Sequence, residues 1–225
     1  MIVAIPLSLT AALCVTPAPG RASPVSFPVV SRVVSVDSSY RALWAAGEAF
    51  ADFVAKADRR KEQWEGNYAR GVAPDALVTR VRAAGAGWRL LVITVPGCSD
   101  SVNSIPYLAS FVDRVPGLEM RLVDRGVGLP VMETHRTPDG RPATPTVILL
   151  DAAFEERGCW IERPAPLIAW LAEREGTLSA SELFDGKMKW YDADAGASSL
   201  EELVLMIEAA GRGGHQCAAA DSRRR

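Results

Sequence analysis

The chain is poor in metal-binding residues and has almost no excess of charge. It contains two histidines and four cysteines, Cys14, Cys98, Cys159 and Cys217, and no two cysteines have the short spacing of a zinc knuckle or a Cys-x-x-Cys redox pair. We therefore expect no metal site and no cofactor. With 25 basic and 27 acidic residues, the net charge of −2 gives no electrostatic reason to expect nucleic acid or an anionic membrane as a partner.

The N-terminal segment, residues 1–23, lacks the features that would settle its role. Its first 15 residues form an apolar run of the length of a secretory signal. No lysine or arginine precedes the run, and Pro6 interrupts it, so a cleaved signal peptide, a disordered leader and a start codon assigned too far upstream all stay open. The location is accordingly either cytoplasmic or exported. The run is too short, and too interrupted by proline, to predict an integral membrane span.

The two histidines and the C-terminal residues are interpreted as surface features. His135 lies among turn residues, and His215 lies within residues 212–225, which we predict to be a disordered tail. Before this tail, residues 198–211 are predicted as a C-terminal helix capped by Ser198 or Ser199, after a linker rich in Asp, Ala, Gly and Ser.

The hydrophobic content of 48% is enough for one main core with helical additions. An N-terminal helical extension is predicted over residues 38–87, and it includes an amphipathic helix over 41–70 that is broken or bent near Gly66. The core itself is predicted over residues 88–175.

Within this core the pattern alternates between strands and helices. Strands are predicted at 88–95, 118–124, 147–151 and 156–161, and helices after Ser101 and over 164–173. Residues 126–140 are predicted as a loop with one helical turn at 131–135. The first two strands would form a parallel unit and the last two an antiparallel hairpin. The fold class is therefore α/β, with a central mixed four-stranded sheet flanked by helices.

Two short motifs lie at the ends of buried strands. The first strand ends in Cys98-Ser-Asp-Ser101, which starts a helix, and Thr144-Pro145 opens the third strand. This order resembles the thioredoxin family over roughly residues 88–173, which supports the fold class and makes it thioredoxin-like. The resemblance implies that Cys98 is the attacking cysteine, that Ser101 occupies the place of the resolving cysteine, and that Thr144 and a cis Pro145 bind an extended thiol substrate.

The position of Cys98 has its own physical consequence. A thiol in the first turn of a helix meets unpaired backbone N–H groups and the positive end of the helix dipole, which favour the thiolate. The hydroxyl of Ser101, one turn further on, could donate to the sulfur. Asp100 would act as a modulator that opposes the thiolate through its like charge.

Three departures from the family pattern limit the chemistry. Gly97 replaces an aromatic residue and loosens the turn, the first strand lacks a buried acid, and the second cysteine is missing. A dithiol cycle within the motif is therefore not available. Monothiol exchange remains, through a mixed disulfide of Cys98 with a protein thiol or a low-molecular-weight thiol. Cys159 is interpreted as a small buried hydrophobe rather than a second thiol, and Cys217 as incidental.

Two alternatives to thiol exchange stay open, so whether the chain is an enzyme is not decided by the sequence. A non-catalytic binding module would use the cis-proline groove without electron transfer. A peroxidase-type thiol would need an arginine close to the sulfur, and the sequence does not show whether Arg141 or another arginine reaches it.

Overall fold

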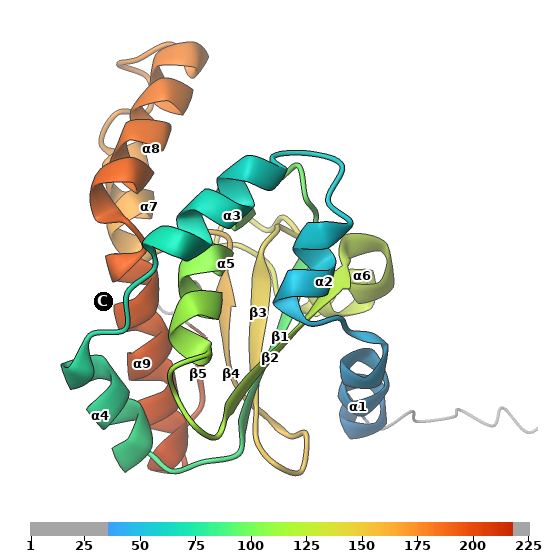
Figure 1. Cartoon of the computed structure of the whole chain (residues 1–225). Coiled ribbons are helices and arrows are strands. Elements are labelled where there is room, and N and C mark those ends of the chain that lie inside the picture. Colours follow the sequence, from blue (N-terminus) through green and yellow to red (C-terminus); the bar gives the residue numbers. More distant parts are fainter. Residues whose placement is uncertain (1–35, 218–225) are drawn as a thin grey trace, which may run out of the picture. The chain divides into compact units, whose positions relative to one another are not determined.

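The computed structural model describes residues 36–217, so the predicted leader and the last part of the predicted tail lie outside the described residues. A five-stranded mixed sheet with strand order β2-β1-β3-β4-β5 forms the centre (Figure 1). Its strands are β1 (Trp88–Thr94), β2 (Leu118–Asp124), β3 (Thr146–Leu150), β4 (Glu156–Ile161) and β5 (Gln216–Cys217). The predicted α/β class and mixed sheet are confirmed, and β5 is an additional short edge strand.

The strand pairing follows the predicted units. β1 pairs parallel with β2, whereas β3 pairs antiparallel with both β1 and β4. The two central strands, β1 and β3, are buried along almost their whole length. A strand that is covered on both faces needs a continuous apolar run, which is the pattern that both sequences have.

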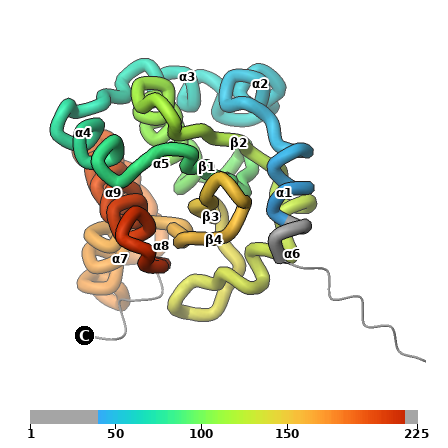
Figure 2. Tube along the Cα trace, turned by 90° about the horizontal axis from the view of Figure 1, so that it is seen from below, coloured from blue at the N-terminus to red at the C-terminus, as the bar shows by residue number. Residues whose placement is uncertain are grey.

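Helices cover both faces of the sheet, as Figure 2 shows. Successive residues of β1 point to opposite faces: Leu90 and Val92 belong to one core, and Leu91 and Ile93 to the other. The first core is closed mainly by α2, α3, α4, α5 and α9, and the second by α1 and α6. The helices are α1 (Val36–Ala46), α2 (Phe50–Ala55), α3 (Lys61–Arg70), α4 (Asp75–Ala83), α5 (Ser99–Val112), α6 (Arg125–Thr134), α7 (Ala165–Ala172), α8 (Ala180–Asp194) and α9 (Ala197–Gly211).

The break predicted near Gly66 was wrong, because Gly66 lies inside α3. The chain turns instead between α1 and α2, and again before α3. At the first turn the backbone of Glu48 exchanges two hydrogen bonds with Leu122 of the edge strand β2, which takes these residues out of the helix. At the second, Arg60 has a left-handed backbone conformation with φ of 58°.

The loop predicted over residues 126–140 contains a full helix, α6, and the single turn predicted there was too short. Glycine and proline lower the intrinsic helix propensity of this segment, but Asp124 caps it by accepting from the Gly126 amide at 2.7 Å. Packing also selects a glycine at position 128, where a Cβ atom would lie 2.5 Å from the side chain of Ile93. Tertiary contacts thus outweigh weak local propensity.

A linker was predicted between the core, which ends at residue 175, and the C-terminal helix, which starts at residue 198. This prediction was also wrong, because residues 180–194 form α8. This helix begins with a capping box in which Ser179 and Glu182 exchange side-chain and backbone hydrogen bonds. The final helix starts after Gly196, so neither Ser198 nor Ser199 is its cap. The predicted disordered tail is wrong for the residues described up to 217, since β5 pairs parallel with β4.

Within residues 36–217, no helix combines the length and the apolar character that crossing a bilayer requires.

Candidate functional site

Cys98 occupies the N-cap position of α5, directly after the turn that ends β1. Its sulfur accepts a hydrogen bond from the backbone amide of Ser101 at 3.4 Å. This is the geometry in which a cap residue satisfies one of the unpaired N–H groups at a helix start. The side chain is half-buried, and Cys98 is the free cysteine of the described residues.

Sheet pairing brings a second segment to this sulfur. Because β1 and β3 are antiparallel neighbours, Ile93 near the end of β1 faces Thr146 at the start of β3. The Thr144–Pro145 peptide bond just before β3 is cis, and the Cys98 thiol donates to the Thr144 carbonyl at 3.1 Å. Two motifs 46 residues apart in sequence therefore meet at one sulfur atom.

The side chain of Ser101 does not make the contact expected from its spacing. Its hydroxyl is buried and has no hydrogen-bond partner among the described residues. The amide of the same residue, rather than the hydroxyl, contacts the sulfur.

Asp100 is buried and receives hydrogen bonds from three side chains. Arg163 Nε lies 3.0 Å and Tyr191 Oη 2.9 Å from Oδ1, and Lys187 Nζ lies 3.1 Å from both carboxylate oxygens. Burial alone would raise the pKa of Asp100, but the bonds and charges of Arg163 and Lys187 hold it below its ordinary value. The expected opposition to a Cys98 thiolate is therefore offset by two cations.

These three partners lie in segments that were not predicted to contribute to the site. Arg163 follows β4, whereas Lys187 and Tyr191 lie on α8, in the region taken for a linker. Lys187 also lies 3.2 Å from the hydroxyl of Ser99, so α8 contacts both Ser99 and Asp100 in the first turn of α5. The sequence does contain one signature of α8. The pattern Ser-x-x-Glu at residues 179–182 is that of a capping box, which predicts a helix start.

The connection between α2 and α3 covers the other side of the cysteine turn. A Cβ atom at Gly97 would lie 3.2 Å from the side chain of Arg59, and Arg60 Nε donates to the Gly97 carbonyl at 3.1 Å. Trp64 Nε1 donates to the carbonyl of Pro96 at 3.0 Å. Two side-chain hydrogen bonds, from Arg60 and Trp64, therefore hold the backbone of this turn, and the loosening by Gly97 stays a prediction.

The arginine that the sequence could not assign to the sulfur has other partners. Arg141 pairs with Asp139 at 2.6 Å and with Glu162 at 3.3 Å. Arg59 and Arg60, from the N-terminal helical segment, lie beside Gly97 instead, and Arg163 pairs with Asp100.

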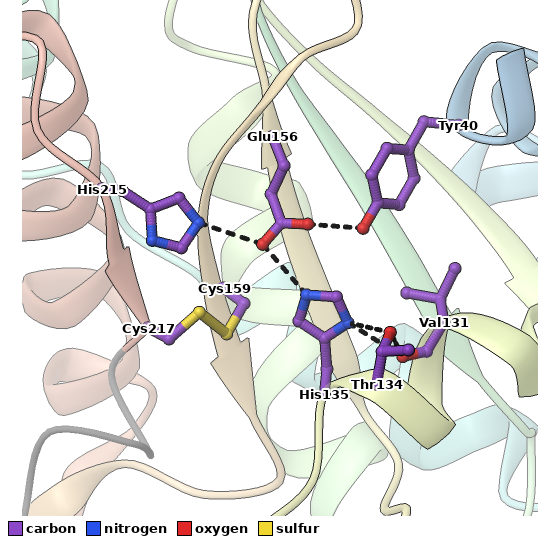
Figure 3. Close-up of a disulfide and its surroundings, with 8 residues drawn as sticks. All are labelled: Tyr40, Val131, Thr134, His135, Glu156, Cys159, His215 and Cys217. Atoms are coloured by element: carbon purple, nitrogen blue, oxygen red, sulfur yellow. Dashed lines mark hydrogen bonds and ion pairs between the residues drawn. A yellow bond between two sulfur atoms is a disulfide. The ribbon is translucent and has the colours of Figure 1, made fainter. Parts of the chain in front are cut away.

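The interpretation of Cys159 as an unpaired hydrophobe and of Cys217 as incidental was wrong. The two form a disulfide that joins neighbouring positions of β4 and β5 (Figure 3). Cys159 is buried, as predicted, but its sulfur is not available as a second thiol while this bond stands. This pairing has little signature in the sequence, since the two cysteines are 58 residues apart and β5 has only two residues.

The surface assignment of His135 was also wrong. Its side chain is 12% exposed, and its Nε2 lies 3.0 Å from Glu156, which also bonds His215 at 3.1 Å and the hydroxyl of Tyr40. Burial alone would raise the pKa of Glu156, but these bonds, chiefly from His135 and Tyr40, lower it to about 2. Figure 3 shows this carboxylate between the two histidines and beside the disulfide.

The mixed sheet between two helical layers, the cysteine that caps the helix after β1, and the cis peptide at its sulfur define a protein of the thioredoxin fold. The chain belongs to the thioredoxin family: a thioredoxin family model matches residues 47–176. No curated protein matches the chain.

Two solved structures are similar to it. One is a protein of unknown function from Pseudomonas aeruginosa, 22% identical, with 76% of this chain and 98% of that chain covered and a TM-score of 0.59. The other is an HIV epitope scaffold, 21% identical, with 75% and 97% covered and a TM-score of 0.57. At these identities the likeness concerns the fold.

Proposed function

We propose that the chain carries out thiol–disulfide exchange through Cys98 alone, by forming a mixed disulfide with a protein thiol or a low-molecular-weight thiol. The observation that carries this proposal is the place of the sulfur, half-buried at the N-cap of α5 and in contact with the backbone of Thr144. Donors at a helix start favour a thiolate, which is the attacking form.

The proposed reaction has two exchanges. The Cys98 thiol loses its proton to solvent, and the thiolate attacks one sulfur of a substrate disulfide. The substrate S–S bond breaks, one half leaves as a thiolate, and the other half stays bonded to Cys98. A second thiol from solution then attacks this mixed disulfide and restores Cys98. A thiol of another molecule is proposed for this step, because residues 36–217 offer no second free thiol: residue 101 is a serine and Cys159 is bonded to Cys217.

Thr144 and Pro145 are the proposed substrate-binding residues. The Thr144 carbonyl accepts from the Cys98 thiol, a bond that needs the sulfur to carry its proton. Ionisation removes that donor and leaves the carbonyl ready to accept a backbone N–H from an extended substrate. Formation of the nucleophile and release of the substrate-binding carbonyl would then be one event.

Mixed-disulfide formation tests the proposal. The full chain is incubated with glutathione disulfide, digested without reductant and analysed by peptide mass mapping. We expect one glutathione on Cys98, removed again by added thiol. If iodoacetamide labels Cys98 but glutathione disulfide gives no adduct there, the thiol is accessible without exchanging. The non-catalytic alternative, a binding module that uses the same groove, would then replace thiol exchange.

The arginine at the cysteine turn predicts a preference for anionic disulfides. Arg59 is exposed and lies against Gly97, the residue before Cys98. We expect Arg59→Ala to slow adduct formation with glutathione disulfide by roughly fivefold, the factor typical of one charge pair near 4 Å in water. Stopped-flow rates measure the effect, which should shrink at high salt.

Two comparisons separate this charge effect from a change in fold. Arg82→Ala removes an exposed arginine of α4 and should leave the rate unchanged. An uncharged disulfide should react equally fast with wild type and with Arg59→Ala. An equal loss with charged and uncharged disulfides would contradict the electrostatic explanation.

A further inference from the structure

Metal-ligating side chains from three segments converge beside the edge of the sheet, away from the residues of the cysteine turn. Glu156 and Cys159 lie on β4, His215 and Cys217 at β5, and His135 directly follows α6 (Figure 3). This cluster gathers both histidines of the chain and two of its four cysteines. The absence of a metal site was predicted from the spacing of cysteines along the sequence. In the folded chain, side chains about 60 residues apart in sequence lie together.

The distances suit a small tetrahedral ion. The ligand atoms of Glu156, His215 and Cys217 all lie within 4.8 Å of one another, and the Cys159 sulfur is bonded to that of Cys217. Within this group, His215 Nε2 and Glu156 Oε1 are 3.1 Å apart. Bond lengths of 2.0–2.3 Å around tetrahedral zinc place neighbouring ligand atoms roughly 3.3 to 3.8 Å apart.

We propose that reduction of the Cys159–Cys217 disulfide creates a Zn²⁺ site with Cys159, Cys217, His215 and Glu156 as its four ligands. Thiolate, imidazole and carboxylate are the ligands that zinc takes in proteins, whereas Ca²⁺ and Mg²⁺ take oxygen alone. While the disulfide stands, its sulfurs are not thiolates, and two of the four ligands are missing.

Neighbouring groups already orient one ligand. Glu156 accepts hydrogen bonds from Tyr40 of α1 and from His135, which directly follows α6. Carboxylates that ligate a metal are usually fixed by such bonds, and losing one costs affinity. His215 is more exposed, with 52% of its side chain accessible, so the ion has a path to the site from solvent.

Reduction of the disulfide and binding of zinc are two separate steps. A dithiol reductant gives two electrons and two protons to the Cys159–Cys217 bond, which breaks into two thiols, while the reductant becomes a disulfide. Zn²⁺ then binds the two sulfurs as thiolates, and their two protons go to solvent. The redox state of one disulfide would thereby decide whether the edge of the sheet is joined by a covalent bond or by a metal ion.

Zinc titration of the reduced and oxidised chain tests this site. The chain carries Cys14→Ser and Cys98→Ser, so that Cys159 and Cys217 are its only thiols after reduction. Competition with a chromogenic chelator under anaerobic conditions gives the Kd, and native mass spectrometry gives the stoichiometry. We expect one Zn²⁺ per reduced chain, bound about 100-fold or more tightly than by the oxidised chain.

Two single variants locate the ion. His215→Ala, which keeps both cysteines, should weaken zinc binding to the reduced chain by about 100-fold. Glu155→Gln removes the neighbouring carboxylate, which pairs with Arg157, and should change nothing. Circular dichroism checks that each reduced chain is folded. Equal zinc affinity in the two redox states, unchanged affinity in His215→Ala, or a reduced chain that neither folds nor binds zinc would each overturn the proposal.

Discussion

Replacing Cys98 by serine should reduce turnover of a glutathionylated peptide to the uncatalysed rate. No hydroxyl can replace the sulfur here, because a mixed disulfide requires a sulfur atom on the protein. The disulfide of Cys159 and Cys217 cannot compensate while it is intact. The assay follows release of the peptide thiol in the presence of glutathione as the second thiol. Cys14→Ser, which removes a cysteine far from the motif in sequence, is the matched control and should keep the wild-type rate.

The neighbouring serine should matter much less than its place in the motif suggests. The amide of Ser101, not its hydroxyl, contacts the Cys98 sulfur, and Ser101→Ala keeps that amide. We expect this variant to retain most of the turnover. Residual turnover in Cys98→Ser close to that of wild type would remove Cys98 from the mechanism, whereas a large loss in Ser101→Ala would show that the hydroxyl moves to the sulfur during the reaction.

Local sequence was enough to predict the centre of the site. Cys98 follows a continuous apolar strand and starts a helix, and Thr144-Pro145 directly precedes another such strand, so both motifs could be located from hydrophobic pattern and turn residues. Sheet pairing then placed them together. Each of these signals lies within a few residues of the feature that it predicts.

The surroundings of the site depend on contacts that no local pattern contains. Lys187 contacts Asp100, which is 87 residues away in sequence. The helix that carries Lys187 was not predicted, because its segment has little hydrophobic periodicity. Arg59 reaches the cysteine turn because the chain bends at Arg60 rather than at the glycine where a bend was expected. Cys217 lies beside Cys159 because β5 pairs with β4. A strand of two residues is too short to show the alternation of apolar and polar residues that predicts a strand.

Asp100→Asn should lower the free energy of unfolding by about 3 to 5 kcal/mol, the usual cost of removing one partner of a buried ion pair. Asn is close to Asp in size, so the variant removes the charge and leaves little empty space. It leaves Arg163 and Lys187 facing a neutral group, and of these Arg163 keeps a second carboxylate, Glu162, at 3.0 Å. Urea unfolding of the full chain near pH 7 measures the loss.

An exposed ion pair provides the matched control. Asp139 pairs with Arg141, and the two side chains are 58% and 52% exposed. Pairs of this kind contribute about 0 to 1 kcal/mol, because water screens them. Asp139→Asn should therefore stay within about 1 kcal/mol of wild type. A loss of the same small size in Asp100→Asn would mean that the buried charges near the cysteine turn are solvated.

A second substitution identifies which cation is left uncompensated. In Asp100→Asn, Lys187 is the buried charge without an acid in hydrogen-bond reach among the described residues, since Arg163 retains Glu162. Lys187→Met removes that charge and keeps a side chain of similar length. We expect the double variant to be more stable than Asp100→Asn alone, so the two single losses should not add. Additive losses would show that the two residues act separately.

The pH dependence of the same comparison follows from the depressed pKa of Asp100. Its carboxylate contributes stability above the pKa of an unfolded aspartate, about 3.9, and loses that contribution as the pH falls through the lower pKa of the folded state. The stability difference between wild type and Asp100→Asn should therefore stay constant from pH 7 to about pH 4 and narrow below it. A difference that already narrows between pH 7 and pH 5 would mean that the pKa of Asp100 is raised, so that burial outweighs Arg163 and Lys187.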